Sequence, residues 1–336
     1  FNQPIGNWDV SNVTDMSIMF STTAAFNQLI GNWDVSSVTD MSRMFAANLN
    51  FTQDISTWDV SSVTDMSYMF DSSNFNQPIG DWDVSSVTNM ERMFTVDDFF
   101  GASVYFNQPI GDWDVSNVTN MNEMFYRNEG FNQPIGNWDV SSVTNMSWIF
   151  RSAFAFNQPI GDWNVSNVTN MESMFKSAAA FNQNLSSWNV SSVNNMSGMF
   201  GGAGDFNQDI SNWQFTADVV FNQSFIKNSG LDINNYDALL AAFSNQNLLD
   251  RVLNAQGLIY CNVSARDDLT TNKGWTIVND SYSFPSLTAP NNISIDPDTG
   301  TCVATNVDLG TPTIIAECGS SLTNNAPNEF PIGVTQ

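Results

Sequence analysis

Six aspartates that recur at one position of a repeated motif are the first candidates for chemistry. The motif reads FNQPIGNWDV in its first copy, and Asp9 is its ninth residue. If the copies stack, these carboxylates form a row with a spacing of about 4.8 Å. Hard cations prefer carboxylate oxygen, so the row predicts weak calcium sites and no other cofactor. The alternative is a solvated acidic face, because no D-x-D-x-D loop makes a site rigid. The row comprises Asp9, Asp34, Asp59, Asp83, Asp114 and Asp139, and it continues as Asn164, Asn189 and Gln214.

The composition excludes several other kinds of chemistry. The 336 residues contain no histidine and carry 34 acidic against 9 basic side chains, for a net charge of −25. Imidazole catalysis and His-ligated zinc are therefore ruled out. A carboxylate-based polysaccharide enzyme would need one unique acid pair, whereas these acids are distributed by the repeat. We expect no enzyme, no nucleic-acid partner and, without an apolar run of about 18 residues, no direct membrane insertion.

A second group of candidates could contact a ligand. The position of Ile18 varies within a fixed frame, which suggests solvent exposure. Its equivalents with large side chains, and the residues of an insertion near residues 95–105, are the predicted contacts. The insertion aromatics could alternatively pack onto the repeats. The predicted ligand-binding residues are Arg43, Tyr68, Arg92 and Trp148 at the variable position, and Asp97, Asp98, Phe99, Phe100 and Tyr105 in the insertion.

Nine copies of the motif must position these residues. Trp8 and Val10 have the two-residue spacing of a strand, and Val13 to Phe20 have the spacing of a helical turn. The Trp and Met positions are predicted to be core. Thr14 and Asp15 are predicted to cap the helical turn, unless the Thr row is a flat ice-binding face. The copies begin at Phe1, Phe26, Phe51, Phe75, Phe106, Phe131, Phe156, Phe181 and Phe206.

The first copy, FNQPIGNWDVSNVTDMSxMF, resembles the BspA-like leucine-rich-repeat surface proteins of bacteria, also found in mycoplasma lipoproteins. The resemblance extends to about residue 215 and implies a parallel-stranded solenoid on the outside of a cell. We therefore expect an α/β solenoid over residues 1–220, a right-handed leucine-rich-repeat-like stack of parallel short strands with short helical turns.

An α+β closing cap is expected over residues 221–282. Tyr236 begins a helical apolar face, residues 257–261 and 274–278 read as strands, and Ser264 could cap a short helix. The segments NYDALLAAF and ARDDLTTNKGWTIVND resemble the closing segment of secreted repeat proteins of Bacteroidota.

Residues 283–290 are expected to be a linker, and residues 291–336 resemble the first part of a hyalin-repeat (HYR) module, an immunoglobulin-like β-sandwich. Runs at 306–309 and 312–315 agree with strands. The resemblance implies a disulfide between Cys302 and Cys318. Cys261 would then be a buried thiol or pair outside this chain, which we expect to be a fragment of a larger protein.

These features together predict a non-enzymatic adhesion or display module on a bacterial cell surface. Its partners would be extracellular glycan or protein ligands and further domains of the same polypeptide. A structural subunit of an extracellular filament or sheath is the alternative, with ice binding or polysaccharide cleavage less favoured.

Overall fold

The computed structural model describes residues 1–97, 101–221, 224–284, 286–288, 295–300, 303–308, 313–315, 318 and 329–331. The chain divides into two compact units. The first comprises Phe1–Leu258 and Asn262–Asp280, and the second Ile259–Cys261 and Ser281–Gln336. Within the described residues, no helix has both the length and the apolar character needed to cross a membrane.

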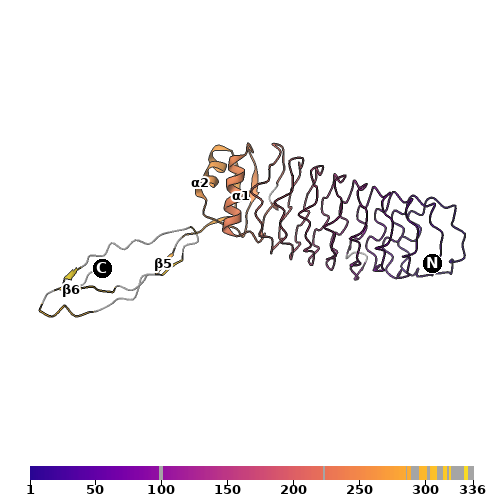
Figure 1. Cartoon of the computed structure of the whole chain (residues 1–336), viewed down its shortest axis with the longest axis horizontal. Coiled ribbons are helices and arrows are strands. Elements are labelled where there is room, and N and C mark those ends of the chain that lie inside the picture. The colour runs from indigo at the N-terminus through magenta and orange to yellow at the C-terminus, as the bar shows by residue number, and fades with distance from the viewer. Residues whose placement is uncertain are drawn as a thin grey trace. The chain divides into compact units, whose positions relative to one another are not determined.

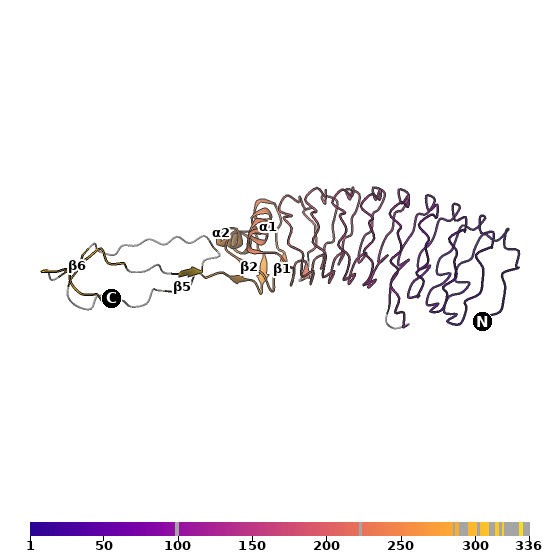
Figure 2. The same cartoon turned by 60° about the horizontal axis from the view of Figure 1, so that its bottom comes forward.

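Successive copies of the motif lie side by side as coils of the chain, from the N-terminus to helix α1 (Figures 1 and 2). Isolated parallel bridges join each coil to the next, beginning with Asp15 to Asp40 and ending with Asn195 to Val220. Alternate backbone N–H groups then donate to the following coil, as Ile18 does to Ser42 O at 2.9 Å. Each coil therefore supplies the carbonyl acceptors for these N–H groups of the preceding coil.

The secondary structure predicted inside each copy is wrong in detail. No strand is assigned at Trp8–Val10, and the segment after Val13 is a run of turns, with Ser21 N donating to Ile18 O at 3.0 Å. Ile18 and Thr22 have left-handed φ values of 62° and 56°, and the equivalents in later coils repeat this geometry. The left-handed residues break the helix. A three-residue apolar spacing cannot distinguish such turns from a helix, because both place the same side chains inward.

The predicted core is confirmed. From the second coil onward the motif Trp and Met side chains are buried, whereas Trp8 and Met19 of the first coil are exposed. Each buried indole donates to a carbonyl of the preceding coil, as Trp33 Nε1 does to Ile5 O at 3.2 Å. Phenylalanine rings stack beside them, with centroids 3.9 Å apart for Phe125 and Phe131.

An amide ladder runs along the coils and ends on α1. Asn27 N donates to Asn2 Oδ1 at 3.1 Å, and later Asn residues repeat the contact. At the last coil, Asp232 N donates to Asn207 Oδ1 at 2.9 Å, and Asn235 Nδ2 donates to the same oxygen at 2.7 Å. Helix α1 (Ile233–Asn245) therefore closes the ladder, and its predicted apolar face (Tyr236, Leu239, Leu240 and Phe243) is buried as expected.

The rest of the cap adds two coils of mixed structure. Strand β1 (Val252–Asn254) pairs in parallel with β3 (Thr276–Val278), which confirms the strand predicted over residues 274–278. Helix α2 (Val263–Asp267) leads into the π-helical turn η3 (Asp268–Asn272). The cap of α2 is Asn262, whose side chain accepts from Ala265 N at 3.1 Å, so the prediction of Ser264 was wrong. Asn262 precedes the first helical residue, which is where a capping oxygen reaches free N–H groups.

In its described residues, the second unit contains three strand pairs. Strand β2 (Ile259–Tyr260) pairs in parallel with β4 (Ser281–Tyr282). Strand β5 (Ser286–Thr288) pairs antiparallel with β7 (Thr313–Ile315), and β6 (Val303–Thr305) with β8 (Glu329–Pro331). The expected linker thus contributes a strand, and the run predicted over 306–309 lies after β6 instead of within it.

The disulfide prediction is corrected. Cys318 pairs with Cys261, with Cα atoms 5.2 Å apart, and not with Cys302, which lies outside the described residues. Pairing of β2 with β4 explains the choice. Cys261 directly follows β2, while Cys318 Sγ lies 3.3 Å from the carbonyl of Ser283, directly after β4.

Gly136 shows why most copies carry glycine at one turn. A Cβ there would lie 2.3 Å from Pro159 O of the next coil. We expect Gly136→Ala to lower the free energy of unfolding by about 2 kcal/mol, because backbone must shift to relieve the overlap. Urea unfolding measures this, and an unchanged midpoint would show that the coils separate freely at this turn.

Other copies of the motif accommodate a side chain at the position of Gly136. Three copies carry Ser in place of this glycine, and each has Asp or Asn two residues earlier. Asp54 Oδ1, for example, accepts from Ser56 N at 2.9 Å. The double variant Pro134→Asp/Gly136→Ser should therefore recover most of the stability that Gly136→Ala loses.

Candidate functional site

Two neighbouring rows of side chains follow the turn segment of the coils, and we call them together the variable strip. Ladder hydrogen bonds fix the register, as between Ser152 N and Lys176 O at 2.8 Å. The first row comprises Ile18, Arg43, Tyr68, Arg92, Glu123, Trp148, Ser173 and Gly198. The second row comprises Ser21, Ala46, Asp71, Thr95, Tyr126, Arg151, Lys176, Gly201 and Lys227.

The backbone makes the first row costly for large side chains. Its non-glycine members have φ between 51° (Ser173) and 62° (Ile18, Trp148). This left-handed conformation costs most residues about 1 kcal/mol or more relative to glycine. Yet the row holds arginine, tyrosine and tryptophan where glycine would fit with less strain. Strained positions that keep large side chains are candidates for function.

Arg43 and Tyr68 form the first cluster of the strip. The Arg43 guanidinium carbon lies 4.1 Å from the Tyr68 ring centroid, and the hydroxyl of Tyr68 donates to Glu91 Oε1 at 2.7 Å. Partial burial, together with Glu91, raises the pKa of Tyr68 to about 12. Arg43 is exposed and Tyr68 half-buried, so both present surface to a partner.

Arg92 joins three coils through ion pairs. Its Nε lies 3.2 Å from Asp71 Oδ2, and an Nη atom lies 2.8 Å from Glu123 Oε2. Burial opposes the charge of Arg92, but the two carboxylates outweigh it and raise the pKa of the guanidinium. Burial also raises the pKa of Asp71, against the attraction of Arg92. The charge of the Arg92 guanidinium is therefore neutralised within the strip.

Trp148 anchors a second aromatic cluster. The Arg151 guanidinium carbon lies 4.0 Å from its ring centroid, and Tyr126 meets the ring edge-on with centroids 5.7 Å apart. The structure thus brings the four predicted contacts Arg43, Tyr68, Arg92 and Trp148 into one row. It adds Tyr126 and Arg151, which the sequence did not single out. A usable signal was that the five basic residues before position 220 all fall within the turn segment: Arg43, Arg92, Arg127, Arg151 and Lys176.

The insertion contributes less than expected to this strip. Tyr105 packs against Gly130, where an added Cβ would be 3.1 Å from the Tyr105 side chain, and its hydroxyl donates to Glu129 Oε2 at 2.8 Å. For Tyr105, therefore, the alternative that the ring packs onto the coils describes the structure. Asp97 N donates to Ser72 Oγ at 3.1 Å, while the predicted contacts Asp98, Phe99 and Phe100 lie outside the described residues.

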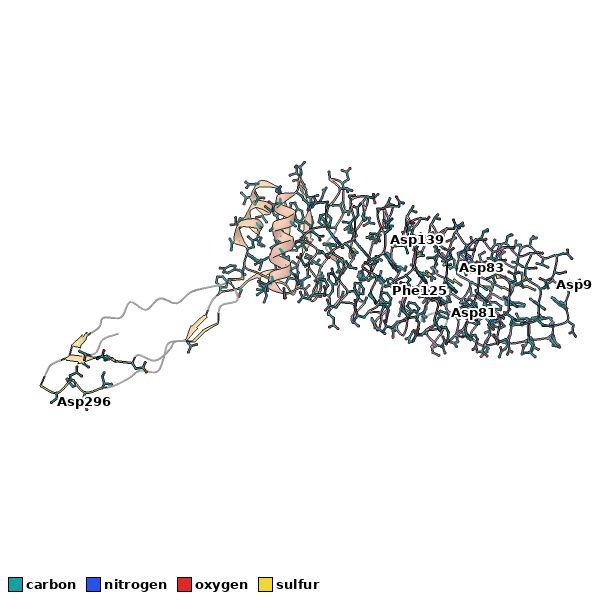
Figure 3. All side chains as sticks on the ribbon, viewed as in Figure 1. Asp9, Asp81, Asp83, Phe125, Asp139 and Asp296 are labelled. Carbon is teal, nitrogen blue, oxygen red and sulfur yellow. A yellow bond between two sulfur atoms is a disulfide. The ribbon has the colours of Figure 1, made fainter. Side chains whose placement is uncertain are left out.

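The aspartate row has a local structural role. Asp9 Oδ1 accepts from Ser11 N at 3.1 Å and from Ser11 Oγ at 2.7 Å, and Asp139, several coils further on, accepts from Ser141 N (Figure 3). The serine hydroxyl and N–H together lower the pKa of Asp9. Among the described residues, no three His, Cys, Asp or Glu side chains lie close enough to hold a metal ion. The calcium sites stay a prediction, and turn capping is what these contacts show.

The threonine row does not cap helical turns as predicted, because no helix follows it. Thr39 Oγ1 instead donates to Thr14 O of the preceding coil at 3.2 Å. Asp15 Oδ1 accepts from Ser17 N at 2.8 Å and so caps a turn. The Thr side chains form an exposed row, flanked by the bridged Asp15 series.

The comparisons with known proteins identify a family. A family model described as "Mycoplasma protein of unknown function, DUF285" matches residues 1–100, 95–171 and 134–238, which is more than half of the chain. No curated protein and no solved structure matches the chain.

Proposed function

We propose, on the premise that the chain belongs to the DUF285 family of mycoplasma repeat proteins, that it is a non-enzymatic adhesion or display module on a bacterial cell surface. The variable strip would contact extracellular glycan or protein ligands. The observation that carries this proposal is the row of Arg, Tyr and Trp side chains on strained left-handed backbone. In a framework that otherwise repeats, this row and the second row of the strip differ from copy to copy.

Many weak contacts along one rigid surface would supply the affinity. The coils hold Arg43, Tyr68 and Trp148 in fixed register, so a ligand that engages one finds the others at a high effective concentration. Aromatic and arginine side chains are also the residues that most often dominate interfaces. The strip therefore suits a ligand with an extended, repetitive shape.

We also propose an architecture for the chain. We interpret the coils as a right-handed leucine-rich-repeat-like solenoid of the BspA-like type, closed by α1 and the cap. We interpret residues 291–336 as HYR-like, of the type found in Bacteroidota surface proteins. Support comes from the coil-to-coil bridges and from the antiparallel pairs β5–β7 and β6–β8.

Removing the two aromatic anchors tests the function. We expect the native chain to bind at least one member of a panel of glycans and matrix proteins. The double variant Tyr68→Ser/Trp148→Ser should bind at least about tenfold more weakly, because interface aromatics contribute over 1 kcal/mol each. Serine already occupies this row at Ser173 with φ 51°, so the fold should tolerate it. Surface plasmon resonance measures both. A native chain that binds no panel member would count against adhesion.

A further inference from the structure

The charge of the repeats is distributed unevenly along the stack. Residues 1–130 contain 17 acidic and three basic side chains, whereas residues 131–230 contain six acidic and three basic. The aspartate row changes in the same region, since Asp139 is followed by Asn164 and Asn189. An anionic ligand is therefore repelled least over the later coils.

The three basic side chains of this region lie in the second row of the strip, and we call them the cationic row: Arg151, Lys176 and Lys227. Ser152 N donates to Lys176 O and Gly202 N to Lys227 O, both at 2.8 Å, which fixes their register. A coil spacing of about 5 Å places Lys176 one step from Arg151 and two steps from Lys227.

No direct ion pair between described residues neutralises the cationic row. None of its three members forms an ion pair with another residue in the part of the chain that the structure describes. Burial lowers the pKa of Lys176, and the like charges of Arg151 and Lys227 lower it further, against the attraction of Glu172. Glu172 itself accepts from Asn195 Nδ2 at 3.1 Å. These three cations repel one another although the protein carries a net charge of −25. Such a cluster is a site that a bound anion would stabilise.

The coil between Lys176 and Lys227 presents only backbone at the strip. Its two strip positions are Gly198 and Gly201, and Gly202 directly follows them. An added Cβ at Gly198 would lie 3.7 Å from Lys176 Cδ, so the lysine stem lies beside this glycine. In the first row, Trp148 is followed by Ser173 and Gly198, so the large indole lies next to small residues. This arrangement leaves an aromatic edge next to the cationic row.

We propose that the cationic row and Trp148 bind a short segment of an acidic polysaccharide, with uronate carboxylates on Arg151, Lys176 and Lys227 and a sugar ring against the indole. This inference rests on the proposed adhesive function and names its ligand class. A peptide fits less well, because the backbone N–H groups of Ser152, Ser177 and Gly202 already donate to the next coil and cannot pair with an added strand.

Titration with short oligogalacturonates tests the ligand class. The native chain should bind them saturably and more weakly as salt rises, and should not bind neutral dextran. Lys176→Gln should reduce affinity at least about tenfold, the loss typical of a charged hydrogen bond. Lys273→Gln is the matched control, since Lys273 lies in the cap, outside the strip, with its Nζ donating to Gln246 O at 2.8 Å, and it should leave affinity unchanged. Near-ultraviolet circular dichroism verifies that each variant is folded.

Two results would overturn the inference. Equal binding by native chain and Lys176→Gln would remove the site, and polyglutamate binding as tightly as oligogalacturonate would remove the polysaccharide assignment. If oligogalacturonates fail to bind while the chain still binds another member of the glycan and matrix panel, this inference is wrong and the adhesive function stands.

Discussion

Phe125→Ala should lower the free energy of unfolding by about 4 kcal/mol, the cost of removing a fully buried phenyl ring from a packed core. Phe125 is fully buried and lies centrally in the stack (Figure 3). Its ring centroid lies 3.9 Å from that of Phe131, 5.7 Å from Phe150 and 5.8 Å from Phe94. One truncation therefore loosens contacts among three successive coils.

The position of the defect should also change the form of the transition. Coils contact only their neighbours, so a weak interface in the middle divides the stack into two halves that unfold less cooperatively. Urea unfolding followed by tryptophan fluorescence should show a broader transition as well as a lower midpoint.

Phe154→Ala is the matched control for that experiment. Phe154 lies one coil further along but is 44% exposed, so its loss should cost no more than about 0.5 kcal/mol. If Phe125→Ala and Phe154→Ala destabilise equally, the aromatic stack does not hold the coils together.

Cys261→Ser should destabilise the second unit by about 4 kcal/mol, as the loop-entropy relation gives for a 57-residue separation. The bridge joins the end of β2 to Cys318, beside the end of β4. The contacts that remain between β2 and β4 without it include a two-residue parallel pairing, the Tyr260–Tyr282 ring contact, and Ser283 N, which donates to Tyr260 O at 3.1 Å.

Hydrogen exchange measured by mass spectrometry would quantify this loss at peptides that cover β2 and β4. Cys318→Ser should reproduce the faster exchange, whereas Cys302→Ser should leave it unchanged. The opposite outcome, with the loss following Cys302, would restore the pairing implied by the HYR resemblance and reject the pairing seen here.

The sequence predicts which side chains are buried better than it predicts the path of the backbone. Trp33 and Met41 could be placed in the core because apolar residues recur at fixed positions of every copy, and burial depends mainly on that recurrence. The turns after Met16 could not be predicted, because left-handed φ at Arg43 or Trp148 contradicts the usual preference of those residues. The neighbouring coil stabilises that conformation, and the sequence of a single copy does not show the contacts between coils.

The candidate site was predictable in part for the same reason. Variation at the Ile18 position is visible in the sequence, and it identified Arg43, Tyr68, Arg92 and Trp148. Arg151 was missed because it lies three residues after Trp148 in the same copy, and only the turn geometry shows that its guanidinium covers the indole. The disulfide was misassigned because the pairing of β2 with β4, which brings Cys261 near Cys318, joins segments separated by the whole of α2 and β3.

We expect the variable strip, and not the aspartate row, to be the contact surface, and one binding comparison tests this. The strip variant is Arg43→Ser/Tyr68→Ser/Trp148→Ser, and the row variant is Asp34→Asn/Asp59→Asn/Asp83→Asn. Both borrow residues that the stack already uses: Ser173 in the strip and Asn164 in the row, where Asn164 Oδ1 still accepts from Ser166 Oγ at 2.8 Å.

Each variant is titrated against the glycan and matrix-protein panel beside the native chain. We expect the strip variant to lose at least about tenfold in affinity and the row variant to bind as the native chain does. Loss of binding by the row variant, with the strip variant unaffected, would contradict the account.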